Sequence, residues 1–491
     1  MPEIFVANPD VKLAFDAIKS KQVRYNVLYA YYEGFHPLKY SASRLKKAFD
    51  QIDTYFSQNW IGVIVDAVLD RLVLKGFDVT DNEPADNVID DLWKLYNIHL
   101  IAEDVHQAAI VTGEAYIVAL QTDDTEQPLD IYFNDPRMCH MFYEGDNPNK
   151  KRVAAKIYTN EEHYCCMVLY YADRFEYYRS NTKLSKKSTL VSTAASFVPD
   201  PITPNGDNFE DNPFEEIPVF HFRTNRSSRK RDIGPSEISM QDAINKTLAD
   251  MLVNAEFATF VQRVIISQSD PGNLKNTPGA NWWIPSGDGK SQQAQVMELG
   301  GRALDPFLNA IDKLATALAI ISRTPKHYFF AQSGDPSGEA LIAMESPLTK
   351  KVKKRQESLG VEWQQLGKFL LLLSGTKDIK RNQIIPTWEP AETIQPQTAA
   401  NIVKTETDSG IPLETAVRRQ GWTKEDMKQL EEDKRKAKKE GTTLAQEALD
   451  RIRAENETDN TPLADNASRM VSGNPIPGGR GNTQAPPGNR S

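Results

Sequence analysis

The sequence has few cysteines and no long apolar stretch. Only three of its 491 residues are cysteine (Cys139, Cys165 and Cys166), and an odd number that includes an adjacent pair is not a disulfide framework, so a reducing compartment is expected. Apolar runs are short, such as residues 369–373, whereas a membrane-spanning helix needs about 20 residues. Residues 1–6 show neither the basic region nor the apolar core of a signal peptide. We therefore expect a soluble protein that folds in a cytoplasm and has no membrane partner.

An excess of positive charge is also missing. The sequence has 58 Lys and Arg residues against 67 Asp and Glu residues, which gives a formal net charge of −9. A protein that wraps DNA by bulk charge needs a basic face, so the composition argues against this class, although it leaves room for a local basic patch. With 40% hydrophobic and 25% charged residues, the composition is that of a globular protein, and the length corresponds to about three domain-sized units.

The usual signatures of nucleotide-binding and hydrolytic enzymes are absent. The sequence contains no G-x-S-x-G, H-E-x-x-H or G-x-G-x-x-G motif. Residues 287–291 (Gly-Asp-Gly-Lys-Ser) imitate the end of a phosphate-binding loop, but the first glycine of that motif would be residue 284, which is isoleucine. A plain hairpin turn is the simpler interpretation of Gly287 to Ser291, and a nucleotide-binding enzyme is the remote alternative. We expect neither catalysis nor a cofactor.

Two short clusters hold residue types that bind metals. Cys139 precedes His140, and His163 lies close to Cys165 and Cys166. Structural zinc sites usually have Cys residues two to four positions apart, and adjacent residues of a strand point to opposite faces. Because neither cluster has the required spacing, we interpret the cysteines as buried apolar residues of a sheet and expect no metal site.

The first half of the chain alternates helical and strand patterns. Apolar residues at helical spacing predict helices over residues 41–56 and 60–74, the second ended by Gly76 and followed by a short strand at 77–79. The same order recurs at residues 101–120, where a helical pattern precedes Gly113 and a strand pattern follows it. Residues 130–225 contain short strand patterns at 130–133, 153–158, 164–171 and 174–178, and then a loop at 198–218 that is rich in Pro, Asn and Asp.

The second half is dominated by helices. Helical stripes predict helices over residues 235–262 and 304–322, and a small β-rich insert separates them. A long helix follows at residues 339–373 and contains Pro347, which removes a backbone hydrogen bond and predicts a kink or break near Glu345. A strand at 383–388, short helices within 396–455 and a disordered tail at 456–491 complete the pattern.

Two local features could bind a partner. Five basic residues form one basic turn of the long helix, which is either a solvated face or a contact with nucleic acid phosphate or with an acidic partner. They are Lys350, Lys351, Lys353, Lys354 and Arg355. The segment 324–330 holds three aromatic residues, which either pack beneath a loop or form the root of a mobile loop that faces a ligand or a channel.

The order of these elements and several local motifs resemble the portal proteins of long-tailed, siphovirus-type bacteriophages, the head-to-tail connector family. The motifs are YYEGFH at residues 31–36 with NWIGVIVDA at 59–67, IPVF at 217–220 with GPSEI at 234–238 and QDAINKT at 241–247, and SGEAL at 337–341 with PL at 347–348 and KKRQ at 353–356. The resemblance extends over roughly residues 20–430 and implies an α+β, mainly helical portal fold.

The resemblance also implies a ring of about twelve copies and a division of the chain into named regions. These are a wing (1–234, with a return at 339–390 that includes the long helix kinked at Pro347), two stem helices (235–262 and 303–322), a clip (263–302), a tunnel loop (323–338) and a crown (391–455), with the tail at 456–491 beyond them.

In this family the ring is a conduit at one capsid vertex through which double-stranded DNA is packaged and ejected. The implied partners are further copies of the chain, the DNA in transit, the terminase large subunit, head-completion and adaptor proteins, and the major capsid and scaffolding proteins. The implied location is the virion, with assembly in the host cytoplasm. A structural capsid or scaffold protein without a channel is the alternative.

From their positions in these implied regions, we infer expected roles for three groups of residues. The tunnel loop would place Lys326, His327, Tyr328, Gln332 and Ser333 in or beside the channel, and the basic turn at residues 350–355 would flank it. Trp282 and Trp283 would pack the clip between neighbouring copies, or else form the core of their own hairpin.

Overall fold

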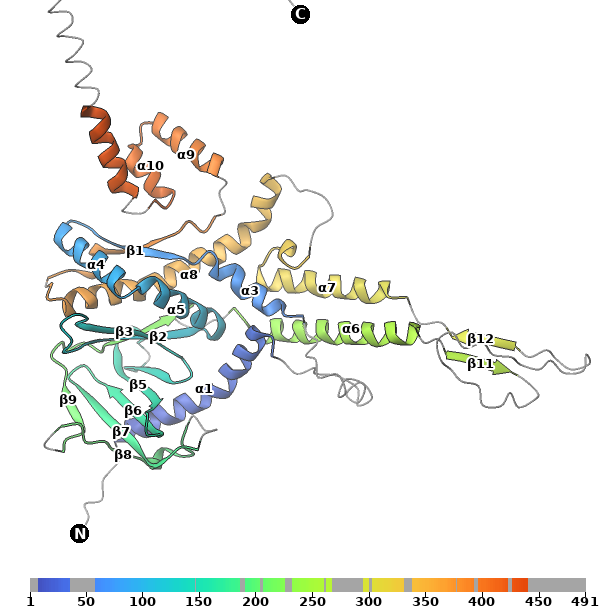
Figure 1. Cartoon of the computed structure of the whole chain (residues 1–491), viewed down its shortest axis with the longest axis horizontal. Coiled ribbons are helices and arrows are strands. Elements are labelled where there is room, and N and C mark those ends of the chain that lie inside the picture. Colours follow the sequence, from blue (N-terminus) through green and yellow to red (C-terminus); the bar gives the residue numbers. More distant parts are fainter. Residues whose placement is uncertain are drawn as a thin grey trace, which may run out of the picture. The chain divides into compact units, whose positions relative to one another are not determined.

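The structure is a computed structural model of the whole chain (Figure 1). The residues that it describes are 8–35, 58–145, 147–185, 190–203, 206–225, 232–259, 262–266, 295–299, 303–330, 338–376, 378–392, 396–422 and 426–439. Several sequence-based predictions fall outside these ranges: the helix at 41–56, Trp282 and Trp283, the turn at 287–291, Gln332 and Ser333, and the tail at 456–491.

The chain divides into two compact units, residues 1–421 and residues 422–491. In the second unit the described residues are Trp422 and a helix at residues 426–439. Among the helices that the structure describes, none is both long enough and apolar enough to span a membrane.

The first unit contains two antiparallel sheets that pack on one another. The smaller has the order β10-β2-β3, and the larger has the order β4-β5-β6-β7-β8, with β9 also paired to β7. Their bounds are β2 (Glu114–Gln121), β3 (Leu129–Asn134), β10 (Val219–Arg223), β4 (Cys139–Tyr143), β5 (Lys151–Thr159), β6 (Tyr164–Tyr170), β7 (Arg174–Lys183), β8 (Phe197–Pro199) and β9 (Phe209–Asp211), with the short 3₁₀ helix η1 (Ala194–Ser196) before β8.

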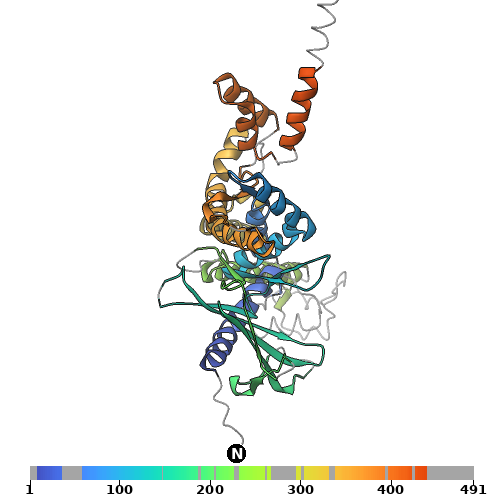
Figure 2. The same cartoon turned by 90° about the vertical axis from the view of Figure 1, so that its left-hand side faces the viewer.

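Alternation along the strands decides which face of the larger sheet meets which neighbour. On β6, Met167 packs with the residues of helix α1 (Pro9–Glu33), while the next residue, Val168, packs with β2 residues such as Tyr116. This is the period of two that a strand imposes. Figures 1 and 2 show α1 along one face of this sheet.

Helix α1 is absent from our sequence-based predictions. The side chain of Asn8 accepts a hydrogen bond from the amide of Asp10 and caps its start, and Gly34 ends it in the left-handed conformation (φ 83°). The buried face of α1 includes Lys21, so a charged residue interrupts the apolar stripe that would have indicated a helix.

The boundaries of the next elements correct one prediction. Helix α3 (Trp60–Leu69) ends five residues earlier than expected, and Gly76 lies inside strand β1 (Leu74–Val79) at a shift of the strand register rather than at a helix end. Leu72 and Leu74 remain buried beyond the helix, so the apolar pattern continues although the backbone has changed. Helices α4 (Glu83–Leu95) and α5 (Ile98–Thr112) follow, and α5 ends at Gly113 before β2, as predicted.

Strand β1 pairs antiparallel with β13 (Ile384–Trp388), which follows the short 3₁₀ helix η3 (Arg381–Gln383). The long helix α8 (Gly338–Leu373) packs against this pair and against β10, with Leu359, Trp363 and Leu366 fully buried. Of the kink or break predicted near Glu345, the break does not occur, because the helix continues through Pro347. Figure 1 shows the first part of α8 running at a different angle from the rest, as a kink would produce.

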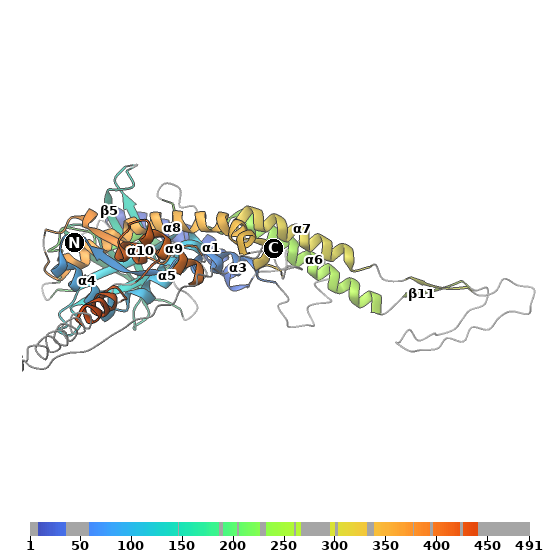
Figure 3. The ribbon, with the colours of Figure 1, turned by 90° about the horizontal axis from the view of Figure 1, so that it is seen from above.

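Helices α6 (Pro235–Thr259) and α7 (Asp305–Ser322) lie side by side (Figures 1 and 3). Their bounds agree with the sequence-based predictions to within three residues. In the segment between them, β11 (Gln262–Ile266) pairs antiparallel with β12 (Gln295–Leu299), which agrees with the β-rich insert predicted between the two helices. The 3₁₀ helix η2 (Lys326–Tyr328) follows α7, and α9 (Pro396–Asp408) and α10 (Leu413–Arg419) pack together at the end of the unit.

Candidate functional site

The segment that follows α7 is anchored by aromatic packing. Phe329 is buried, and the ring centroids of Phe329 and Phe330 lie 5.6 and 5.1 Å from that of Trp60 on α3. The adjacent Tyr328 hydroxyl accepts a hydrogen bond from Arg71 at 2.8 Å. These aromatic residues therefore pack in the main core of the first unit, as the first of the two interpretations predicted.

Polar contacts join this anchor to the start of α8. The carboxylate of Glu345 lies 3.1 Å from Nη2 of Arg71 through one oxygen and 3.7 Å from Nε2 of His327 through the other. Lys326 forms an ion pair at 2.8 Å with Asp312 of α7. Lys326, His327 and Tyr328, which we predicted to lie in or beside a channel, thus contact neighbouring elements of the same chain.

The basic turn of α8 does not face outward as a unit. Lys351 and Arg355 are buried and share the carboxylate of Asp232, which lies 2.9 Å from Lys351 Nζ and accepts hydrogen bonds of 3.1 and 3.2 Å from Arg355. The prediction that these two residues contact an outside partner is wrong, because both side chains are buried and already pair with Asp232 inside the fold. Lys351 also donates to the carbonyl of Ser322, which fastens α8 to the end of α7.

The electrostatics of Asp232 fit this structural role. Burial alone would raise its pKa, but the charges of Lys351 and Arg355 outweigh burial and hold the pKa below its ordinary value. The carboxylate is therefore ionised at neutral pH, and the cluster carries two positive charges and one negative charge.

The other cations of the turn remain at the surface. Lys353 is exposed and paired with Glu392, whereas Lys350 and Lys354 are exposed and form no ion pair with any residue in the described ranges. Arg323, exposed at the end of α7, forms none either. Because Lys351 joins α8 to Ser322, these three side chains belong to one junction, and we call Arg323, Lys350 and Lys354 the basic junction.

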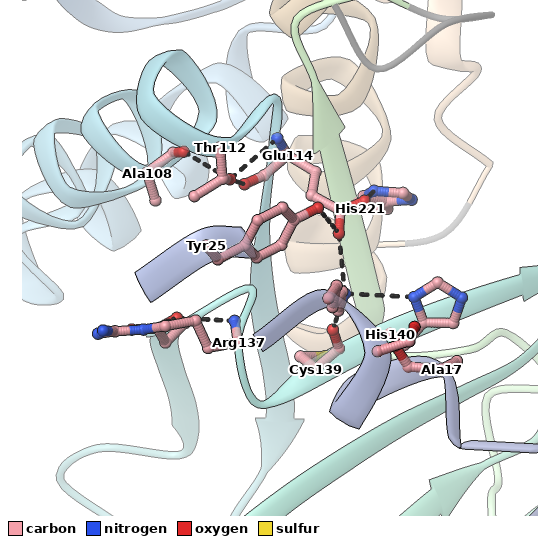
Figure 4. Close-up of polar contacts among 12 residues, drawn as sticks. Ala17, Tyr25, Ala108, Thr112, Glu114, Arg137, Cys139, His140 and His221 are labelled. Carbon is pink, nitrogen blue, oxygen red and sulfur yellow. Dashed lines mark hydrogen bonds and ion pairs between the residues drawn. The ribbon is translucent and has the colours of Figure 1, made fainter. Parts of the chain in front are cut away.

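A second buried polar cluster surrounds Glu114 (Figure 4). Its carboxylate accepts hydrogen bonds of 2.8 Å from Lys21 and from Tyr25, and lies 3.0 Å from Nε2 of His221. Lys21 also donates to the carbonyl of Cys139 at 2.6 Å and to Nδ1 of His140 at 3.2 Å. The cluster thus joins α1, β2, β4 and β10.

Sequence reasoning missed this cluster, and no local signal could have found it. Lys21 and Glu114 are 93 positions apart, and Glu114 and His221 are 107 apart, so only the fold brings them together. A buried charge pair of this kind contributes little net stability but is costly to break, because either partner alone would be left uncompensated.

The cysteine clusters contain no metal site in the part of the chain that the structure describes, where no group of three or more candidate metal ligands occurs. All three cysteines are buried, and burial raises the pKa of the Cys139 thiol to about 12. An open pocket of about 490 Å³ lies elsewhere, lined by Gln364 of α8 together with Arg381 and Asn382.

Comparison with known protein families decides the identity. Residues 15–440 match the family model described as phage portal protein, SPP1 Gp6-like. The chain belongs to this portal protein family. Two curated relatives carry the name portal protein: that of Mycobacterium phage D29 is 24% identical over 339 residues, and that of Mycobacterium phage L5 is 24% identical over 326 residues. Each match covers 61% of this chain and 62% of the relative, so the chain spans less than two thirds of the length of these relatives.

The family match confirms the resemblance recognised in the sequence. The range that matches the family model includes helices α6 and α7, the aromatic residues 328–330, the basic junction and the helix at residues 426–439. The mixture of helices and sheets confirms the predicted α+β class.

Proposed function

We propose that the chain assembles into a ring that conducts double-stranded DNA through one vertex of a phage capsid during packaging and ejection. The observation that carries the proposal is the family match over residues 15–440, which covers most of the first unit and the beginning of the second. On this proposal the terminase large subunit, head-completion and adaptor proteins, and the major capsid and scaffolding proteins are the partners, and the virion is the location.

The regional division proposed from the sequence fits the described elements. The pair α6 and α7 would be the stem, and the β11–β12 ladder between them would belong to the clip. The sheets, together with α8 and β13, would form the wing, residues 323–338 would be the tunnel loop, and α9 and α10 would begin the crown.

Helix α7 supports the proposal of a ring because it has more apolar surface than the described part of its own chain covers. Its buried face contains Ile311, Ala315 and Leu318. A second stripe remains partly exposed at spacings of three and four residues, which is the pattern of a helix packed against another helix. This stripe consists of Phe307, Ala310, Leu314, Ala317 and Ile321. We propose that a neighbouring copy covers this stripe in the ring.

The basic junction is the proposed DNA contact of the channel. Each phosphate that a cation neutralises steepens the fall of log affinity with log salt concentration by about 0.9. A copy that contributes only a few cations therefore binds DNA weakly and lets the duplex slide. The net charge of −9 weakens the attraction of DNA to the surface as a whole. Gln332 and Ser333 stay proposed channel residues, and Trp282 and Trp283 stay proposed clip residues.

Electron microscopy of the purified full-length protein tests the conduit. We expect rings with a central pore, and twelve copies of 55.2 kDa would give about 660 kDa. Monomers without a ring under all conditions would refute the proposal, and sheets or closed shells without a pore would favour a capsid or scaffold protein.

An Ile321→Asp variant tests the α7 contact, because this residue is 41% exposed in the single chain and its charge would be buried in the ring. We expect loss of rings with an unchanged circular dichroism spectrum. The matched control is Val23→Asp on α1, an aliphatic residue that is 74% exposed, which we expect to assemble normally.

A further inference from the structure

The helix at residues 426–439 has a strongly divided charge. Three acidic residues, at positions 431–433, are followed by five cations within the six positions 434–439, and every residue from 431 to 439 is exposed. The helix as a whole has six basic and four acidic residues and is net positive, in a chain whose net charge is −9.

Local electrostatics explain only part of this arrangement. Cations near a helix C-terminus are favoured by the helix dipole, by about 0.3–1 kcal/mol each. However, like charges four positions apart destabilise a helix, and this spacing separates Lys434 from Lys438 and Arg435 from Lys439. The ion pair between Lys436 and Asp433 is 3.9 Å long and more than half exposed, so it contributes little. Glu431 and Glu432 lie four positions before Arg435 and Lys436, so attractive pairs at the same spacing offset part of this repulsion.

The cations are arranged on one side. At about 100° per residue, Lys434, Lys438, Arg435 and Lys439 fall within an arc of about 140° of the helix circumference. These six positions span about 9 Å along the helix axis. A duplex carries one phosphate charge per about 1.7 Å of its axis, so it presents about five charges over the same length.

We propose that the face formed by Lys434, Arg435, Lys438 and Lys439, which we call the basic helix face, binds the phosphates of double-stranded DNA. The choice of DNA over an acidic protein rests on the proposed function, in which duplex DNA is the polyanion that the assembly meets. The site is separate from the basic junction, which lies in the other unit of the chain. Four phosphate contacts give a logarithmic salt slope of about −3.6, so affinity should fall about 150-fold between about 50 and 200 mM salt.

The test is fluorescence anisotropy of the full-length protein with a labelled duplex of about 30 base pairs, measured over this salt range. The neutralised variant, with Lys434, Arg435, Lys438 and Lys439 replaced by Gln, should lose up to about 3.6 of the salt slope. The matched control is Glu431→Gln with Glu432→Gln in the same helix. It should bind more tightly, because it removes repulsion from the phosphates.

A charge-preserving variant separates loss of charge from loss of structure. Replacing Lys434, Lys438 and Lys439 with Arg should keep the wild-type salt slope, and circular dichroism should report the same helix content for all variants. An unchanged slope in the neutralised variant would overturn the proposal. Competition by polyglutamate as strong as that by duplex DNA, at equal charge concentration, would overturn DNA as the partner. Electron microscopy of the same samples tests ring formation independently. If rings form and the salt slope of the neutralised variant is unchanged, only this inference is refuted.

Discussion

Replacing Asp232 with asparagine tests whether the buried ion cluster fastens α8 to the rest of the first unit. In the folded chain the carboxylate lies 2.9 Å from Lys351 and accepts two hydrogen bonds from Arg355, and all three side chains are at most 9% exposed. The substitution keeps the size and one carbonyl oxygen of the side chain but removes the negative charge that two buried cations share.

The expected cost follows from desolvation. Removing one partner of a buried ion pair costs about 3–5 kcal/mol, because the remaining charge is left uncompensated in a poorly solvated site. Here two cations lose their counterion, so we expect the free energy of unfolding of the Asp232→Asn variant to fall by this amount at pH 7. Since a folded domain is typically stable by about 5–15 kcal/mol, the variant should be only marginally folded.

The pH dependence gives a second signature. Because the pKa of Asp232 is lowered on folding by Lys351 and Arg355, its ionised form stabilises the folded state above the unfolded-state pKa of about 3.9. This stabilisation is lost as the pH falls through the lower folded pKa. The difference between wild type and variant should therefore stay constant from about pH 8 to pH 5 and shrink below about pH 4.

Urea unfolding followed by tryptophan fluorescence is the assay. Asp433→Asn is the matched control, because its partner Lys436 lies 3.9 Å away in an exposed pair, and we expect a change below about 0.5 kcal/mol. A change of less than about 1 kcal/mol for Asp232→Asn at pH 7 would refute the reasoning, since the cluster would then be hydrated rather than buried.

Two further predictions concern buried titratable groups. Burial raises the pKa of Cys139 to about 12 and that of Cys165 to about 11, so both thiols should resist a thiol reagent at pH 8 in the native protein and react after denaturation; rapid native reaction would contradict their burial. Burial also lowers the pKa of His106 to about 3, and the ring of His106 accepts a hydrogen bond from the indole of Trp363. Below pH 6.5 the unfolded chain therefore binds a proton that the folded chain does not. As the pH falls from about 6 to 4, the free energy of unfolding of the wild type should decrease by about 1.4 kcal/mol per pH unit more than that of His106→Gln. Equal pH slopes for the two proteins would refute this.

The helices that could be predicted are those with a complete local signal. Helices α6 and α7 have uninterrupted apolar stripes, and α6 begins at Pro235, so their bounds were nearly right. Helix α5 ends at a left-handed glycine, which the sequence indicates directly. Helix α3 was predicted too long, because Leu72 and Leu74 stay buried after the helix has ended.

The errors have a common cause in distant partners. Lys21 interrupts the stripe of α1 and is buried only because Glu114 lies opposite, 93 positions away. Lys351 and Arg355 resembled a surface patch, and their burial depends on Asp232, which is 123 positions from Arg355. A single sequence gives charge and spacing, but the solvation of a charge depends on contacts that only the folded chain makes.

The pairing of β1 with β13 has a consequence for synthesis. The backbone hydrogen bond that closes this ladder joins Thr80 to Gln383, which are 303 positions apart. At about 5–20 residues per second, a ribosome needs about 15–60 s to make the intervening chain. During that interval β1 and the apolar face around Phe77 have neither β13 nor α8 to cover them, since Trp363 contacts Phe77 only after α8 emerges. A nascent chain stalled before α8 would thus expose an unpaired strand edge, and chaperone binding should concentrate on this window of translation.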